Sequence, residues 1–195
     1  MIYCATGNPG KLREFRLAAE RFGVEIEELP GLRQIPPCEE TGRTFKENAI
    51  LKAEYYGEHA PGLLFADDSG LEVDALDGAP GVVSARYAGA GATDEMNNKL
   101  VLGNLRGRDD RRARFVCVIA LANRGKLVRT FRGTVEGEIL EQPRGDGGFG
   151  YDPLFYYPPF GCSFGEVPPD KKMAVSHRGK ALTALFRYLS DSPLP

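Results

Sequence analysis

Residues 112–134 decide the fold: in RARFVCVIALANRGKLVRTFRGT, two strand-like segments, residues 112–122 and 126–134, flank a polar Asn123-Arg124-Gly125 stretch. Runs rich in Val, Ile and Phe that flank a short glycine-containing connection are typical of an antiparallel β-hairpin. The next residues, Val135 to Leu140, favour an extension of the second strand. We therefore expect one long hairpin in this part of the chain.

Shorter apolar segments predict further strands before the hairpin. Residues 2–5 form a short apolar run, and residues 24–29 alternate as a strand does. Residues 63–67 form an apolar run that ends in charge, and residues 71–76 alternate again. The Asp68-Ser69-Gly70 sequence between them is typical of a turn, so we expect two separate strands here.

Helices are predicted where start and stop signals coincide with apolar periodicity. Thr44 and Glu47 fit a capping box, in which a hydroxyl and a carboxylate bind backbone N–H groups at a helix start. Gly23 is placed as the C-cap of an earlier helix whose apolar stripe occupies positions 12, 15, 19 and 22. The capping-box helix runs to about His59, a third helix is capped by Thr93 and runs to about Leu105, and a fourth covers Arg178 to Leu189.

Strands joined by helices occur together with strands joined by hairpins, which indicates the α/β class with a mixed sheet and flanking helices. The chain has 195 residues, whereas one domain averages about 150 residues. This length favours a single domain over residues 1–195. Hydrophobic residues make up 42% of the chain, which is enough for one core without disulfides.

The overall charge excludes some classes of partner. The chain has 25 Lys and Arg against 27 Asp and Glu, a formal net charge of -2. No global basic field therefore attracts nucleic acid or an anionic membrane, and we expect neither as a partner. Any anion-binding site must be local.

Targeting and redox signals point to the cytoplasm. The longest apolar run, Phe115 to Ala122, is eight residues long, and a bilayer span needs about 20. The first residues are strand-like and carry no secretory signal, so we expect a cytoplasmic protein. The four cysteines form no C-x-x-C pair, and Cys4 and Cys117 lie in apolar runs, where a thiol behaves as a small hydrophobe.

A glycine-containing turn, Thr6-Gly7-Asn8-Pro9-Gly10-Lys11, separates the first strand from the first helix. Such a turn presents backbone N–H groups and the positive end of a helix dipole to one point, and Lys11 adds a full charge. The motif is two residues short of a P-loop, and Leu12 replaces the metal-binding hydroxyl, which disfavours a P-loop NTPase. It fits a phosphate cradle or, alternatively, an ordinary turn with an exposed lysine.

Two adjacent carboxylates, Asp67 and Asp68, follow an apolar run. Neighbouring residues in a strand point to opposite faces, so we expect only one of them to enter a given site. Carboxylate oxygens suit Mg²⁺, and Glu39 and Glu40 form the nearest further acidic cluster. The alternative is a simple turn, and Ser69 lacks the elbow motif of a serine hydrolase.

Two further clusters carry binding chemistry. Residues 145–153, GDGGFGYDP, combine glycines that allow close backbone approach with an aromatic face for a flat ring, although a flexible loop anchored by its aromatics is the alternative. Lys171, Lys172 and residues 176–180, SHRGK, place cations at a helix start. Cations there oppose the helix dipole, so they favour an anionic or acceptor-rich partner over a merely solvated helix start. His177 is more informative than His59, which we expect to be exposed.

Together these four motifs describe a nucleotide site. The turn before the first helix would be a phosphate cradle, and the adjacent carboxylates would form an acidic metal site. Phe149 would be an aromatic platform for the base, and the cations at residues 171–180 would form a donor cluster. Over nearly its whole length the chain resembles the noncanonical purine nucleoside triphosphate pyrophosphatases, the inosine/xanthosine triphosphate pyrophosphatase family. The motifs that carry the resemblance are Thr6-Gly7-Asn8 through Lys11, Thr44 to Ala49 with Lys52, Ala66 to Leu71, Gly78 to Gly81 through Ser84 to Tyr87, Gly147 to Pro153, and Ser176 to Gly179.

The resemblance implies Mg²⁺-dependent hydrolysis of ITP, dITP and XTP to the monophosphate and pyrophosphate, which cleanses the nucleotide pool. It also implies a homodimer whose protomer has an elongated mixed sheet and two lobes around a central cleft. One departure from the family pattern is Cys162 to Glu166, where a Thr and an Ala commonly precede the Glu.

Roles follow from motif position in this family. Asp68 would be the proton acceptor and, with Glu39, a metal ligand, while Lys11 would neutralise the phosphates with Lys52 as a helper. The implied nucleotide-binding residues are Thr6, Gly7, Asn8, Pro9, Gly10, Lys11, Lys52, Ser69, Phe149, Gly150, Tyr151, Asp152, Lys172, His177 and Arg178.

Hydrogen-bond polarity predicts the choice of base. Hypoxanthine and xanthine carry a 6-oxo acceptor where adenine carries a 6-amino donor, so donors from Lys172, His177 and Arg178 would favour the former. Two other functions fit the same residues: a pyrophosphatase for modified pyrimidine triphosphates of the Maf-like class, and a nucleotide-binding or RNA-binding module without activity.

Overall fold

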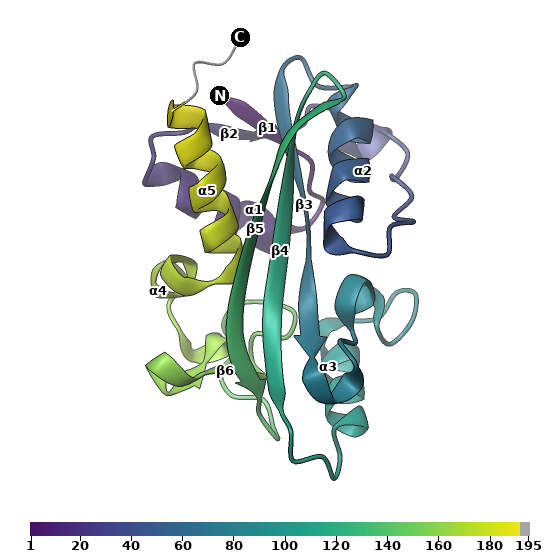
Figure 1. The fold of residues 1–195 in the computed structure, drawn as a ribbon, viewed down its shortest axis with the longest axis vertical. Coiled ribbons are helices and arrows are strands. Elements are labelled where there is room, and N and C mark those ends of the chain that lie inside the picture. Colours follow the sequence, from purple (N-terminus) through teal and green to yellow (C-terminus); the bar gives the residue numbers. More distant parts are fainter. Residues whose placement is uncertain (192–195) are drawn as a thin grey trace.

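The structure is a computed structural model that describes residues 1–191, and these residues form a seven-stranded sheet flanked by helices (Figure 1). The strand order in the sheet is β2-β1-β3-β4-β5-β6-β7. The strands are β1 (Ile2–Cys4), β2 (Ile26–Glu28), β3 (Leu63–Val73), β4 (Arg112–Asn123), β5 (Lys126–Ile139), β6 (Phe155–Tyr157) and β7 (Cys162–Ser163). The α-helices are α1 (Pro9–Glu20), α2 (Phe45–Gly57), α3 (Asp94–Asn104), α4 (Pro169–Val175) and α5 (His177–Asp191).

The long strand β4 runs antiparallel to both of its neighbours, β3 and β5, and the three strands extend along the length of the molecule (Figure 1). Strand β1 pairs in parallel with both β2 and β3, so the sheet is mixed, as the sequence predicts. The expected hairpin is confirmed, and β5 includes the residues after Thr134. Arg124 and Gly125 at its tip have φ angles of 49° and 75°, a left-handed conformation that a two-residue hairpin turn requires.

The predicted turn at Asp68-Ser69-Gly70 is wrong, because β3 continues without interruption from Leu63 to Val73. Every residue of β3 has a partner on β4, and Asp68 lies opposite Val118. A continuous neighbouring strand offers a hydrogen-bonding ladder along the whole segment, and this tertiary pairing outweighs the local turn preference. Gly70 also permits a close approach, since a Cβ there would lie 2.7 Å from the carbonyl oxygen of Gly81.

The helix starts agree with the sequence better than the helix ends do. The Glu47 N–H donates to Thr44 Oγ1 (3.1 Å) and the Thr44 N–H donates to Glu47 Oε2 (3.2 Å), which confirms the capping box. Helix α2 ends at Gly57 rather than at His59. Helix α1 has Arg21 as its C-cap, and Gly23 follows with a φ of 62°.

Both faces of the central strands are buried. Helices α1 and α5 cover one face over a cluster that includes Phe15, Phe65, Ile119 and Phe186. Helix α2 covers the other face, where Phe45 and Ala49 pack with alternate residues of β3 and β4. A third cluster lies at the end of the sheet near α3 and β6. Because β4 is covered on both faces, its sequence is a nearly continuous apolar run rather than an alternating one.

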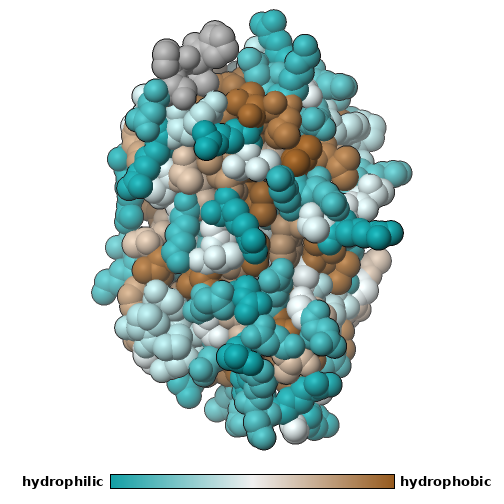
Figure 2. All heavy atoms as spheres, viewed as in Figure 1, coloured by the Kyte–Doolittle hydropathy of each residue, from teal (hydrophilic) through white to brown (hydrophobic). Residues whose placement is uncertain are grey.

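The surface is mixed in character. Figure 2 shows hydrophilic side chains over most of one face, with apolar residues in separate patches between them. Within residues 1–191, no helix combines the length and the apolar character that crossing a membrane requires. The four cysteines are free, and Cys4 and Cys117 are buried as expected.

A glycine at the contact between α5 and β5 gives a stability test. A Cβ at Gly133 would collide with the carbonyl oxygen of His177 and lie 2.8 Å from the Ala181 nitrogen. We expect Gly133→Ala to lower the free energy of unfolding by about 1–3 kcal/mol in urea titrations, since helix and strand must move apart. In the control, Gly103→Ala, the added methyl lies at an exposed position of α3 and meets no atom within 4 Å. Equal stability of the two variants would contradict this packing.

Candidate functional site

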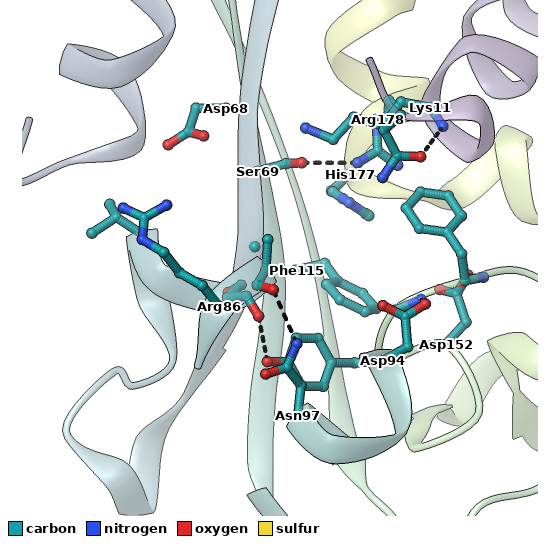
Figure 3. Close-up of a pocket in the computed structure, with 18 of the residues that line it drawn as sticks. Lys11, Asp68, Ser69, Arg86, Asp94, Asn97, Phe115, Asp152, His177 and Arg178 are labelled. Carbon is teal, nitrogen blue, oxygen red and sulfur yellow. Dashed lines mark hydrogen bonds between the residues drawn. The ribbon is translucent and has the colours of Figure 1, made fainter. Parts of the chain in front are cut away.

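One pocket gathers most of the residues that the sequence singles out (Figure 3). Its lining comes from the start of α1, the middle of β3, the segment before α3, residues 145–153, which we call the glycine-rich loop, and the start of α5. The expected site residues that line it are Asn8, Lys11, Lys52, Asp68, Ser69, Phe149, Gly150, Tyr151, Asp152, Lys172, His177 and Arg178. The others that line it are Glu40, Gly70, Val82, Ser84, Ala85, Arg86, Asp94, Asn97 and Phe115.

Five expected site residues do not line this pocket. Two of them, Thr6 and Gly7, belong to the turn before α1, and two, Pro9 and Gly10, are the first residues of that helix. The fifth is Glu39, which is exposed, whereas its neighbour Glu40 faces the pocket and contacts Lys52. The choice between two adjacent glutamates depends on the path of an irregular loop, which sequence periodicity does not specify.

The turn before α1 differs from the predicted cradle of free N–H groups. Asn8 is the N-cap of α1, and its Oδ1 accepts hydrogen bonds from the N–H groups of Gly10 (2.8 Å) and Lys11 (3.1 Å). Pro9 has no N–H group. The capping side chain therefore already uses two of the donors that were expected to face a phosphate, and Lys11 is the charged group that this motif contributes to the pocket.

Asp67 and Asp68 point to opposite faces of β3, as strand geometry predicts. Asp67 contacts Lys11 Nζ at 2.9 Å and accepts a hydrogen bond from the Ser69 hydroxyl at 3.2 Å. Burial would raise the pKa of Asp67, but Lys11, Arg178 and Lys52 outweigh it and lower the pKa to about 2. Asp67 is therefore a permanently charged partner of the cations beneath the pocket.

Asp68 faces α2, where Lys52 Nζ lies 2.9 Å from its carboxylate and Asn48 Nδ2 donates to it at 3.3 Å. The same Lys52 ammonium lies 3.3 Å from Glu40, so two carboxylates share one cation. Burial raises the pKa of Asp68, and Lys52 opposes this shift only in part. A carboxylate with a raised pKa is a stronger proton acceptor than an ordinary aspartate.

The predicted donor cluster has an acidic partner that the sequence analysis missed. Glu14 of α1 contacts Lys172 Nζ at 2.7 Å, and Arg178 Nη1 donates to its other carboxylate oxygen. Lys172 also contacts Asp152 at 2.5 Å, and Arg178 Nη2 donates to Ser69 Oγ at 2.8 Å. The Glu14 carboxylate therefore supplies part of the negative charge that the cations near the start of α5 were expected to require. The position of Glu14 next to Phe15, on the side of α1 that is buried, was the feature of the sequence that could have indicated a buried acidic partner.

The glycine-rich loop holds Phe149 over these cations. The Phe149 ring centroid lies 5.1 Å from Lys172 Nζ and 5.4 Å from Arg178 Cζ. The ring also approaches Gly10 so closely that a Cβ there would lie 2.7 Å from Phe149 Cδ1. Gly10 therefore contributes to the site by leaving room for this ring.

Helix α3 fixes the peptide groups of Gly150, which follows Phe149. The Gly150 N–H donates to Asp94 Oδ2 at 2.6 Å, and Asn98 Nδ2 donates to the Gly150 carbonyl at 2.9 Å. Asp94 and Asn98 are four residues apart on one face of the helix, so both reach the same residue. The aromatic platform is thus held by a helix outside the family motifs listed above.

His177 is buried at the base of the pocket and stacks on Phe115, with ring centroids 4.7 Å apart and an interplanar angle of 18°. Within residues 1–191 its Nδ1 has no hydrogen-bond partner. Burial, followed by the nearby charges of Arg178 and Lys172, lowers the pKa of His177 well below its ordinary value. The imidazole is therefore neutral at physiological pH. As expected, His59 is exposed.

Comparison with known proteins places the chain among relatives of similar length. Residues 2–188 match the sequence model of the Ham1 family. A dITP/XTP pyrophosphatase from Acidobacterium capsulatum is 49% identical over 197 residues, covering 96% of this chain and 97% of that protein. A dITP/XTP pyrophosphatase from Thermus thermophilus is 49% identical, covering 100% of this chain and 94% of that protein. The solved structure of a HAM1 protein from Coxiella burnetii is 43% identical, with a TM-score of 0.87 over 98% of each chain.

The state of His177 predicts how stability depends on pH. Below its ordinary pKa of 6.5 the unfolded chain binds a proton at this residue and the folded chain does not, so stability falls as pH decreases. In urea titrations from pH 7.5 to 5.5, the free energy of unfolding of the wild type relative to His177→Gln should fall by up to about 1.4 kcal/mol per pH unit below 6.5. The exposed-site control His59→Gln should follow the wild type, and parallel curves for His177→Gln would contradict the prediction.

Proposed function

The chain belongs to the Ham1 family, and on that premise we propose that it hydrolyses the noncanonical purine nucleoside triphosphates ITP, dITP and XTP to the monophosphate and pyrophosphate. The observation that carries the proposal is that Asp68, Lys11 and Arg178 line one pocket. The resemblance further supports a homodimer that works in the cytoplasm and removes these nucleotides from the pool.

The acidic end of the pocket fits magnesium. The carboxylates of Asp68 and Glu40 already converge on one cation, the Lys52 ammonium, and both offer the hard oxygen ligands that Mg²⁺ prefers. Residues 1–191 contain no cluster of three or more acidic, His or Cys groups suited to a metal, and Mg²⁺ usually takes only one or two carboxylates with phosphates and water. We assign Asp68 and Glu40, in place of Glu39, as the residues that would hold it. When bound, the ion neutralises phosphate charge.

The chemistry of the chain's own residues follows from their placement. Asp68 orients a water molecule toward the α-phosphorus and accepts its proton, a role that its raised pKa favours. Lys11 and Lys52 offset the charge of the phosphate oxygens. The bond to the pyrophosphate breaks directly, so the reaction needs no covalent intermediate.

The other end of the pocket supports selection of the base. Phe149 offers an aromatic face, and Lys172 and Arg178 supply positive N–H donors beneath it. Arg178 uses Nη1 on Glu14 and Nη2 on Ser69, and its buried Nε lies 3.7 Å from Asp67 with no hydrogen-bond partner within residues 1–191. A 6-oxo acceptor meets donors here, whereas the 6-amino group of adenine would leave them unpaired.

The activity itself is tested by pyrophosphate release. We expect release from ITP and XTP with Mg²⁺ and none with EDTA. Asp68→Asn removes the proton acceptor and should lower kcat by about 10²- to 10⁴-fold. The control Asp109→Asn changes an exposed carboxylate away from the pocket and should retain wild-type rates. Wild-type protein that releases no pyrophosphate from either substrate would contradict the proposed function, and preference for modified pyrimidine triphosphates would favour the Maf-like class.

Base selection is tested with Arg178→Ala in a steady-state comparison of ITP, XTP, GTP and ATP. Because this side chain donates to the 6-oxo group in our proposal, kcat/KM for ITP should fall roughly 10- to 100-fold, and residual ATP turnover should fall less. Arg187→Ala, an exposed change on the same helix, is the matched control. Equal losses on ITP and ATP would remove Arg178 from base selection.

A further inference from the structure

The cations of the pocket differ in whether they already have an acidic partner. Five Lys and Arg side chains line it, and four of them contact a carboxylate. These four pairs are Lys11 with Asp67, Lys52 with Asp68, Lys172 with Glu14, and Arg178 with Glu14. The fifth, Arg86, makes no ion pair and no side-chain hydrogen bond within residues 1–191, and its side chain is exposed. It is the uncompensated positive charge of the site.

The backbone on either side of Arg86 is nevertheless fixed. The Ser84 carbonyl accepts a hydrogen bond from the Tyr151 hydroxyl at 2.7 Å. Asn97 donates to the Ala85 carbonyl at 3.1 Å and accepts from the Ala88 N–H at 2.8 Å. These contacts tie the segment to α3 and to the glycine-rich loop. The Arg86 side chain therefore extends from a rigid support, and its guanidinium donates no hydrogen bond to any residue in the described part of the chain.

Arg86 lies toward the reacting end of the pocket. In Figure 3 its guanidinium extends on the same side of β3 as Asp68, while Arg178 and His177 lie on the other side of that strand. Asp68 is the proton acceptor of the proposed reaction, so this side is where the phosphates lie. Lys11 belongs to α1 and Arg86 to the segment before α3, which places cations on two separate walls.

We propose that Arg86 binds the phosphates that leave as pyrophosphate, an inference that rests on the proposed function. Lys11 and Lys52 are each paired with a carboxylate, which offsets part of their charge, whereas Arg86 contributes a full positive charge to a polyanion. Its planar guanidinium also matches two phosphate oxygens at once. When water oxygen bonds to the α-phosphorus, its proton passes to Asp68 and the bridging oxygen leaves with the bonding electrons. Arg86 offsets that charge by donating hydrogen bonds and keeps its own protons.

The test measures binding without turnover. Isothermal titration calorimetry with inorganic pyrophosphate, and separately with inosine monophosphate, compares the wild type with Arg86→Gln, Arg86→Lys and Arg106→Gln. We expect Arg86→Gln to weaken pyrophosphate binding roughly 10- to 100-fold and to leave monophosphate binding unchanged. Arg86→Lys should recover part of the loss, since it restores charge but not the bidentate geometry. Arg106 is exposed on the turn after α3 and away from the pocket, so its variant should match the wild type.

Kinetics provide the second measurement. For Arg86→Gln, kcat/KM should fall by a similar factor for ITP and for ATP, because the lost contact is to phosphates that both share. Unchanged pyrophosphate binding, or equal losses of pyrophosphate and monophosphate, would overturn the role of Arg86 while leaving the proposed function intact. Failure of the proposed function has a different result, namely wild-type protein that hydrolyses neither ITP nor XTP.

Discussion

Pairing of β3 with β4 along the whole of β3 is the constraint on which the site depends. A strand directs successive side chains to opposite faces, so Asp67 and Asp68 cannot share one environment. Asp67 meets Lys11 and Arg178 on the face covered by α1 and α5, and Asp68 meets Lys52 on the face covered by α2. One strand thereby separates a permanently charged carboxylate from one whose pKa is raised.

The balance of buried charge follows from this arrangement. Isolated buried charges are costly, and each cation beneath the pocket has a carboxylate within contact distance. Glu14 is central because it contacts both Lys172 and Arg178 from α1. The cations are thus held in position before any ligand binds, and preorganised charges of this kind need little rearrangement during a reaction. Arg86, which has no ion-pair partner among the 191 described residues, differs from these cations because it is exposed, and an exposed charge keeps its contact with water.

The glycine-rich loop illustrates how separate parts of the fold converge. Phe149 lies against Gly10 of α1 and over cations from α4 and α5, while α3 holds the next residue through Asp94 and Asn98. A change in any of these elements would therefore alter the aromatic platform. The platform is a property of the assembled fold rather than of the loop alone.

The sequence by itself determined the features that depend on neighbouring residues: the capping box at Thr44, the hairpin around Gly125 and most of the motif residues that line the pocket. Only the tertiary structure decided that β3 is continuous, that Glu40 rather than Glu39 faces the pocket, and that Glu14 partners the donor cluster. The physical reason is the separation along the chain over which each kind of interaction acts. Caps and turns act over a few residues, whereas Glu14 and Lys172 are 158 positions apart and meet only because α1 and α4 pack beside the same sheet.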